Sequence, residues 1–102
     1  TTHGGSAGPL RAGKGSCYEG GMRVPGVMRW PARIPAGSVC GEVATQLDML
    51  PTIAAMTGAA VPADRVIDGK SILPLMTAEA GATSPHEAFF YYRGDRLDAV
   101  RS

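Results

Sequence analysis

GSAGPLRAGKGSCYEGGMRVPG, residues 5–26, is the stretch that says most about the fold and chemistry of this chain. It is polar, rich in glycine and without helical or strand periodicity, so it predicts a shaped loop. Within it, Lys14 stands between Gly13 and Gly15. Glycine allows the backbone to approach a ligand closely, and lysine offers a compact positive charge with three hydrogen-bond donors. The pattern therefore favours a loop that presents Lys14 to an anion with several oxygens.

Two other interpretations of Lys14 compete with this one. Residues 8–14 match the phosphate-binding pattern G-x-x-x-x-G-K, but Gly15 takes the place of the Ser or Thr that binds magnesium. That pattern also needs a buried strand before it and a helix after it, and the flanking residues predict neither. Nucleotide binding is therefore disfavoured. A solvated lysine in a surface loop stays open on the residues alone.

The best helix of the chain is predicted further along, over residues 46–58. Asp48 can cap its start, and Pro51 falls in the first turn, where a backbone N–H has no helical partner. Gly58 is a natural C-terminal stop. One face at helical spacing carries Leu50, Ile53, Ala54 and Thr57.

The remaining elements are shorter. Residues 22–30 favour an edge strand, interrupted by a proline and a glycine. Residues 71–76 predict one or two helical turns. Residues 88–92 predict a strand, followed by a turn at 93–95 and a returning strand at 97–100. Helices together with strands place the chain in the α/β class.

Composition excludes several classes of protein. The 102 residues suffice for one small domain, and a net charge of +1 offers no basic field for nucleic acid. A hydrophobic share of 44% argues against disorder, and no apolar run is long enough to cross a bilayer. We therefore expect neither nucleic acid nor a membrane as a partner.

Two cysteines, Cys17 and Cys40, are too few for a scaffold of several disulfides or for a structural zinc site. Free thiols and a single disulfide both stay open, and no metal site is predicted. The chain begins at Thr1 without a methionine and ends at Ser102 inside an expected strand. We therefore expect a fragment of a longer protein.

The run from Gly13 to Pro25 resembles a segment characteristic of the sulfatase family, in which Gly-Lys is followed by an aromatic residue, Glu-Gly-Gly, Arg and Pro. Later motifs resemble the same family in the same order. They are Trp30-Pro31 with residues 34–37, residues 48–52 with Gly58, Asp68-Gly69 with residues 73–75, and residues 90–95. The last of these looks most like the arylsulfatase A and N-acetylgalactosamine-6-sulfatase branch.

The resemblance implies part of an alkaline-phosphatase-like fold. The chain would supply a Gly-rich loop, an edge strand, one main helix and a C-terminal β-hairpin of the smaller sheet. Residues 1–80 would form the end of the large α/β domain, and residues 81–102 the start of the small C-terminal sheet domain.

The resemblance also implies a function, the hydrolysis of sulfate esters, with Lys14 as the residue that contacts the sulfate. Family members use a formylglycine made from cysteine in a Cys-x-Pro-x-Arg motif, and a calcium ion. Neither Cys17 nor Cys40 has that context, and the resemblance places the calcium ligands upstream. We therefore expect no cofactor in this chain and no activity from the chain alone.

Other loop residues receive roles by the same resemblance. Tyr18 is expected to wall the substrate pocket or to join the core, and His3 could reach a sulfate. The expected supports of the loop are Gly13, Gly15, Glu19 and Arg23. His86, just before the expected strand at 88–92, is predicted to be a surface residue.

Two alternatives to a sulfatase segment stay open. One is a stand-alone module that binds sulfate or a sulfated sugar. The other is a non-functional truncated fragment that self-associates through uncovered apolar surface, such as that of Leu50, Ile53, Met56 and Leu73. The expected partner of the full enzyme is a sulfated small molecule or sugar. The compartment stays unknown, because the resemblance allows a periplasmic, secreted or lysosomal protein.

Overall fold

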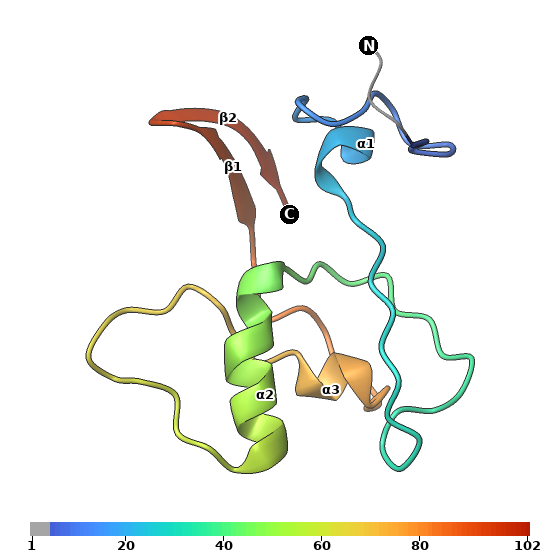
Figure 1. Ribbon diagram of the computed structural model, residues 1–102, viewed down its shortest axis with the longest axis vertical. Helices are drawn as coiled ribbons and strands as arrows, with labels where there is room; N and C mark the ends of the chain where they lie inside the picture. Colours follow the sequence, from blue (N-terminus) through green and yellow to red (C-terminus); the bar gives the residue numbers. More distant parts are fainter. Residues whose placement is uncertain (1–4) are drawn as a thin grey trace. The chain divides into compact units, whose positions relative to one another are not determined.

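The computed structural model describes residues 5–102, which form a small α/β chain with short helices and a two-stranded antiparallel sheet (Figure 1). Its elements in chain order are α1 (Glu19–Met22), the 3-10 turn η1 (Gln46–Asp48), α2 (Met49–Thr57), α3 (Leu73–Met76), β1 (Phe89–Arg93) and β2 (Arg96–Arg101).

The described residues divide into two compact units. The loop–hairpin unit comprises residues 5–27 and 88–102, and the helical unit comprises residues 28–87. The domain boundary expected between residues 80 and 81 concerns the larger enzyme and stays a prediction.

The helix predicted over residues 46–58 is confirmed in the helical unit. It begins as the turn η1 and continues as α2, with Pro51 in the first turn of α2. Gly58 ends it in the left-handed conformation, with φ of 72°. Its N–H bonds to the carbonyl of Ala54, which satisfies one of the orphan groups at the helix end.

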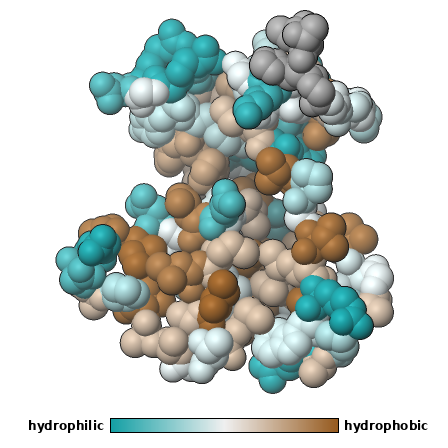
Figure 2. Space-filling view, viewed as in Figure 1, coloured by the Kyte–Doolittle hydropathy of each residue, from teal (hydrophilic) through white to brown (hydrophobic). Residues whose placement is uncertain are grey.

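The buried face of α2 shares only Ala54 with the predicted one. Leu50 and Ile53 are 51% and 55% exposed, whereas Thr52 and Ala54 are buried with Ile72 and Leu75. Hydrophobic residues are also visible at the surface in Figure 2. Thr52 is buried because its hydroxyl accepts a hydrogen bond of 3.0 Å from the backbone N–H of Ile72. The hydrogen bond between Thr52 and Ile72, which are far apart in the sequence, thus helps to decide which face of α2 is buried.

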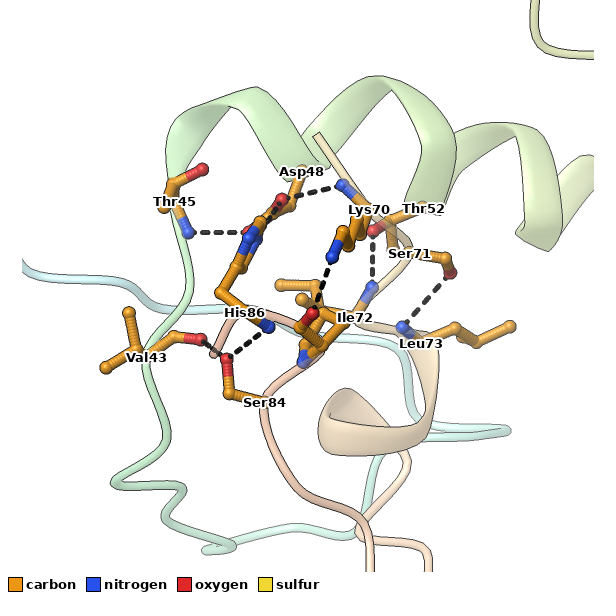
Figure 3. Close-up of polar contacts among 11 residues, drawn as sticks. Val43, Thr45, Asp48, Thr52, Lys70, Ser71, Ile72, Leu73, Ser84 and His86 are labelled. Atoms are coloured by element: carbon orange, nitrogen blue, oxygen red, sulfur yellow. Dashed lines mark hydrogen bonds and ion pairs between the residues drawn. The ribbon is translucent and has the colours of Figure 1, made fainter. Parts of the chain in front are cut away.

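Asp48 is the centre of the helical unit (Figure 3). Its side chain is fully buried and accepts hydrogen bonds from the backbone N–H groups of Thr45 at 2.7 Å and Lys70 at 2.9 Å. The ring of His86 lies 2.7 Å away through Nε2. Asp48 holds the predicted N-cap position of α2, but its side chain makes no capping hydrogen bond there. The carboxylate instead turns back to Thr45 and across to residues far along the chain.

His86 was also predicted wrongly, as a surface residue. Its side chain is only 10% exposed and contacts Asp48. The hydroxyl of Ser84 accepts the backbone N–H of His86 at 3.1 Å and donates to the carbonyl of Val43 at 2.6 Å. Nζ of Lys70 donates to the carbonyl of Pro85 at 2.9 Å. These contacts fasten the segment around residues 84–86 to the rest of the helical unit.

Gly69 lets the chain reach Asp48. A Cβ atom at this position would lie 3.1 Å from the backbone nitrogen of Asp48 and closer still to the carbonyl group of Leu47. The backbone at Gly69 passes directly against the start of the main helix, so only a residue without a side chain fits there.

The hairpin predicted near the C-terminus is confirmed as β1 and β2, which pair antiparallel. Residues 90 and 92 pair with 100 and 97, so one extra residue, Asp98, forms a bulge in β2. The bulge changes the alternation of side chains along β2. As a result the exposed residues Phe90, Tyr92, Leu97 and Val100 share one face.

The edge strand expected over residues 22–30 is not confirmed. Residues 23–30 have no regular secondary structure and pair with no strand in the described part of the chain. Val24 and Val27 are residues that favour strands. They are nevertheless 83% and 93% exposed, and no described strand pairs with them. No helix among the described residues is long and apolar enough to cross a membrane.

The buried carboxylate predicts an acid-sensitive helical unit. Burial raises the pKa of Asp48, but the hydrogen bonds from Lys70, Thr45 and His86 outweigh it, and the pKa lies below its ordinary value. A carboxyl group whose pKa is lowered by folding stabilises the fold above its unfolded pKa. That contribution disappears as the pH falls below about 4.

We therefore expect the free energy of unfolding to drop below about pH 4, measured by denaturant titration followed by circular dichroism. Asp48→Asn, which cannot titrate, should lose about 1–3 kcal/mol at pH 7 and show a flatter acid dependence. Asp64→Asn is the control, because Asp64 pairs with Arg65 on the exposed surface. Equal acid profiles for Asp48→Asn and the parent chain would contradict the role given to Asp48.

Candidate functional site

The loop around Lys14 packs on the single turn of α1 in the loop–hairpin unit. The N–H of Gly20 donates to the carbonyl of Arg11 at 2.9 Å. A Cβ at Gly20 would lie 2.6 Å from that same oxygen, and one at Gly21 would lie 2.7 Å from the carbonyl oxygen of Gly13. Gly20 and Gly21 of the Glu-Gly-Gly sequence are thus explained, because the neighbouring loop backbone leaves no room for a side chain at either position.

Lys14 lies in a tight turn at the outside of this loop. The carbonyl of Gly13 accepts the N–H of Ser16 at 3.2 Å and its hydroxyl at 2.9 Å. Gly15 adopts a φ of 95°, which a residue with a side chain rarely takes. Ala12 also has a positive φ, 61°, a strained conformation for alanine. The turn is therefore specified by backbone geometry on both sides of Lys14.

An open hollow of about 900 Å³ lies over this turn. Its lining is rich in small residues, among them Gly5, Gly13, Gly15 and Gly20, and includes the cations Lys14 and Arg23. Lys14 is exposed, and its ammonium group has no hydrogen bond or ion pair with the described residues. An uncompensated cation in a glycine-lined hollow is suited to bind an oxyanion.

Glu19 ties α1 to the hairpin. Its carboxylate pairs with Arg23 at 3.3 Å and with Arg101 of β2. The Arg101 guanidinium lowers the pKa of Glu19, and Arg23 lowers it further. Glu19 therefore stays ionised and its charge is compensated, so it does not neutralise Lys14. The Glu19–Arg23 pair is partly exposed.

A second tie joins the hairpin to the loop. Nη2 of Arg93 donates to the carbonyl of Gly15 at 3.3 Å, and Nε of Arg93 lies 3.1 Å from Asp98. Asp98 also pairs with Arg96 at 2.6 Å. Hydrogen bonds from Arg96 and the charge of Arg93 hold the pKa of Asp98 below its ordinary value. Sequence reasoning missed Arg93 and Arg101, because no local pattern links them to a loop nearly eighty residues away.

The other predicted site residues are placed differently. Tyr18 is 45% exposed, and the guanidinium of Arg11 lies over its ring, 3.9 Å from the centroid. Tyr18 does not line the hollow around Lys14. His3 lies outside the described residues. The roles expected for Tyr18, His3, Gly13, Gly15, Glu19 and Arg23 stay predictions.

Among residues 5–102 no group of three or more His, Cys, Asp or Glu side chains could hold a metal ion. Cys17 and Cys40 are both free thiols. The calcium ion and the formylglycine expected for the longer enzyme stay predictions.

Comparisons with known proteins agree on one family. The family model described as "N-sulphoglucosamine sulphohydrolase, C-terminal" matches residues 13–101. The chain is 44% identical over 99 residues to steryl-sulfatase of Homo sapiens, and 48% identical over 99 residues to arylsulfatase D of Homo sapiens. It is 46% identical over 97 residues to N-acetylgalactosamine-6-sulfatase of Canis lupus familiaris.

These matches cover nearly all of this chain but only a small part of each relative. They cover 97%, 96% and 95% of this chain, but 17%, 16% and 18% of the three relatives. The chain thus spans about one sixth of the length of the proteins it resembles.

The packing of the loop on α1 predicts a large effect of small substitutions. Gly20→Ala should displace the carbonyls of Arg11 and Ala12 and loosen the loop, because its Cβ has no room. We expect faster tryptic cleavage after Arg11 and Lys14, measured by mass spectrometry under native conditions. Gly26→Ala is the matched control, since nothing lies within 4 Å of its added Cβ. Equal cleavage rates in the two variants would show that the close packing is absent in solution.

Proposed function

This chain belongs to the sulfatase family, and from that premise we propose that it supplies the sulfate-binding lysine, Lys14, of a sulfuric ester hydrolase. The observation that carries the proposal is the ammonium group of Lys14, which makes no hydrogen bond or ion pair with residues 5–102. It stands exposed in a glycine-lined hollow, in a turn whose backbone is hydrogen-bonded on both sides.

The role of Lys14 is electrostatic. Hydrolysis of a sulfate ester transfers the sulfuryl group from the ester oxygen to an attacking nucleophile. Negative charge develops on the oxygens around the sulfur while the bond to the ester oxygen breaks. A cation fixed beside those oxygens stabilises the transition state, and it requires little reorganisation when the loop is already in place.

The charges around Lys14 favour an anionic ligand. In the described loop–hairpin unit the basic residues are Arg11, Lys14, Arg23, Arg93, Arg96 and Arg101, and the acidic residues are Glu19, Asp95 and Asp98. Glu19 and Asp98 each pair with two arginines. Because the acidic groups nearest the loop are already paired, the field over the hollow is positive.

The nucleophile and the metal ligands of the reaction come from outside this segment. Neither cysteine lies in a Cys-x-Pro-x-Arg motif, and the described acidic residues form no cluster. The substrate is a sulfated small molecule or sugar, and its identity depends on the rest of the enzyme.

An isolated chain of residues 1–102 should therefore have no sulfatase activity. We expect an aryl sulfate to be hydrolysed at the uncatalysed rate, measured by release of the coloured phenol. Calorimetry with inorganic sulfate and a sulfated monosaccharide separates the alternatives. Heat of binding without turnover would favour a stand-alone binding module, and turnover that disappears in Lys14→Ala would overturn the proposal of an inactive segment.

In the full-length enzyme, Lys14→Ala should lower kcat/KM for an aryl sulfate by about 10²–10³, the usual effect of removing one preorganised donor. The inhibition constant of inorganic sulfate should rise as well. Lys14→Arg should recover part of the activity, because it keeps the charge in a different shape. Arg65→Ala is the control for loss of a surface cation. A kcat/KM of Lys14→Ala within about threefold of the parent would refute the sulfate contact.

A further inference from the structure

We infer that the β1–β2 hairpin holds the lysine loop in its working shape, and that Arg93 is a positioning residue for Lys14. The inference rests on the proposed function, because it assigns how the sulfate contact is kept in place. Arg93 does not line the hollow, so it acts through the backbone next to Lys14.

The two peptide carbonyls that flank Lys14 are both engaged. The carbonyl of Gly13, on one side, accepts two hydrogen bonds from Ser16 within the loop. The carbonyl of Gly15, on the other side, accepts its hydrogen bond from Nη2 of Arg93, at 3.3 Å. The first contact is local, whereas the second comes from a strand 78 residues further along the chain. Only the second can fix the direction of the loop relative to the hairpin.

The guanidinium of Arg93 is itself oriented. Its Nε lies 3.1 Å from Asp98, whose side chain is only 12% exposed. Asp98 is the bulge residue of β2, and Nε of Arg96 binds its other oxygen at 2.6 Å. Because the carboxylate is held by the hairpin, the planar guanidinium can direct its remaining N–H groups at Gly15.

The far end of the hairpin provides a second attachment. Arg101 pairs with Glu19, the first residue of α1, across 82 positions of sequence. The loop backbone packs directly on Gly20 and Gly21 of the same turn. The hairpin therefore holds the loop near Lys14 through Arg93 and at its base through Arg101.

The flanking glycines make such a brace necessary. Gly13 and Gly15 give the turn its close approach to a ligand, but they also leave the backbone the widest choice of conformations. A lysine on a mobile loop would lose part of its catalytic effect, because the ammonium must be ordered each time substrate binds. The brace removes that cost before the substrate arrives.

A double-mutant cycle in the full-length enzyme tests the inference. Arg93→Ala should lower kcat for an aryl sulfate about tenfold, the scale of a lost hydrogen bond from a charged donor. In the Lys14→Ala background the same change should have an effect of less than about twofold, because the brace then has nothing to position. Arg93→Lys should recover little, since an ammonium cannot bind Asp98 and Gly15 in the same plane.

Arg65→Ala is the matched control. It also removes one positive charge and one arginine–aspartate pair, but Arg65 lies in the helical unit and takes no part in holding Asp98 or the loop. We expect its kcat within about twofold of the parent. Melting temperatures of all variants establish that they fold, and Arg93→Gln provides a second variant that keeps an N–H donor.

The outcomes separate the inference from the proposed function. If Lys14→Ala is fully active, the proposed function fails, and the brace fails with it. If Lys14→Ala loses activity but Arg93→Ala is as active as Arg65→Ala, only the brace is refuted. Equal losses from Arg93→Ala in both backgrounds would likewise refute it, since they would show that Arg93 acts independently of Lys14.

Discussion

The helical unit depends on one buried carboxylate. Asp48 has no exposed surface and yet remains hydrogen-bonded to Thr45, Lys70 and His86. A buried charge without partners would be strongly unfavourable, so the three segments that bring these partners must meet at the start of α2. With few fully buried hydrophobic side chains in the described residues, this polar centre supplies much of the specificity of the unit.

The structure of the loop–hairpin unit depends on glycines and arginines together. The glycines allow the loop to fold closely on α1 and to leave a hollow around Lys14. The arginines of the hairpin then restrict the loop, through the carbonyl of Gly15 and the carboxylate of Glu19. The glycines thus allow the loop backbone to pack closely, and the arginines of the hairpin restrict its motion. Glycine alone cannot do both, because it leaves the backbone flexible.

The proposed function places this site in a longer sulfatase. Lys14 is the cation proposed to bind the sulfate, and neither cysteine lies in a Cys-x-Pro-x-Arg motif. The chain also spans only about one sixth of the relatives' length. Under the proposed function, this segment stabilises charge on the sulfate, and residues elsewhere in the enzyme carry out bond formation and cleavage.

The sequence by itself determined the family, the glycine loop with Lys14, the ends of the main helix at Asp48 and Gly58, and the hairpin. These features depend on short-range patterns: glycine spacing, helix stop signals and strand alternation.

Other features became known only from the structure. Asp48 and His86 are buried together, Leu50 and Ile53 are exposed, and residues 23–30 pair with no described strand. The tertiary structure alone placed Arg93 against Gly15 and Arg101 against Glu19. The reason is that these contacts join residues 38 to 82 positions apart, and the energy of a buried or bridging polar group depends on partners that no local window contains.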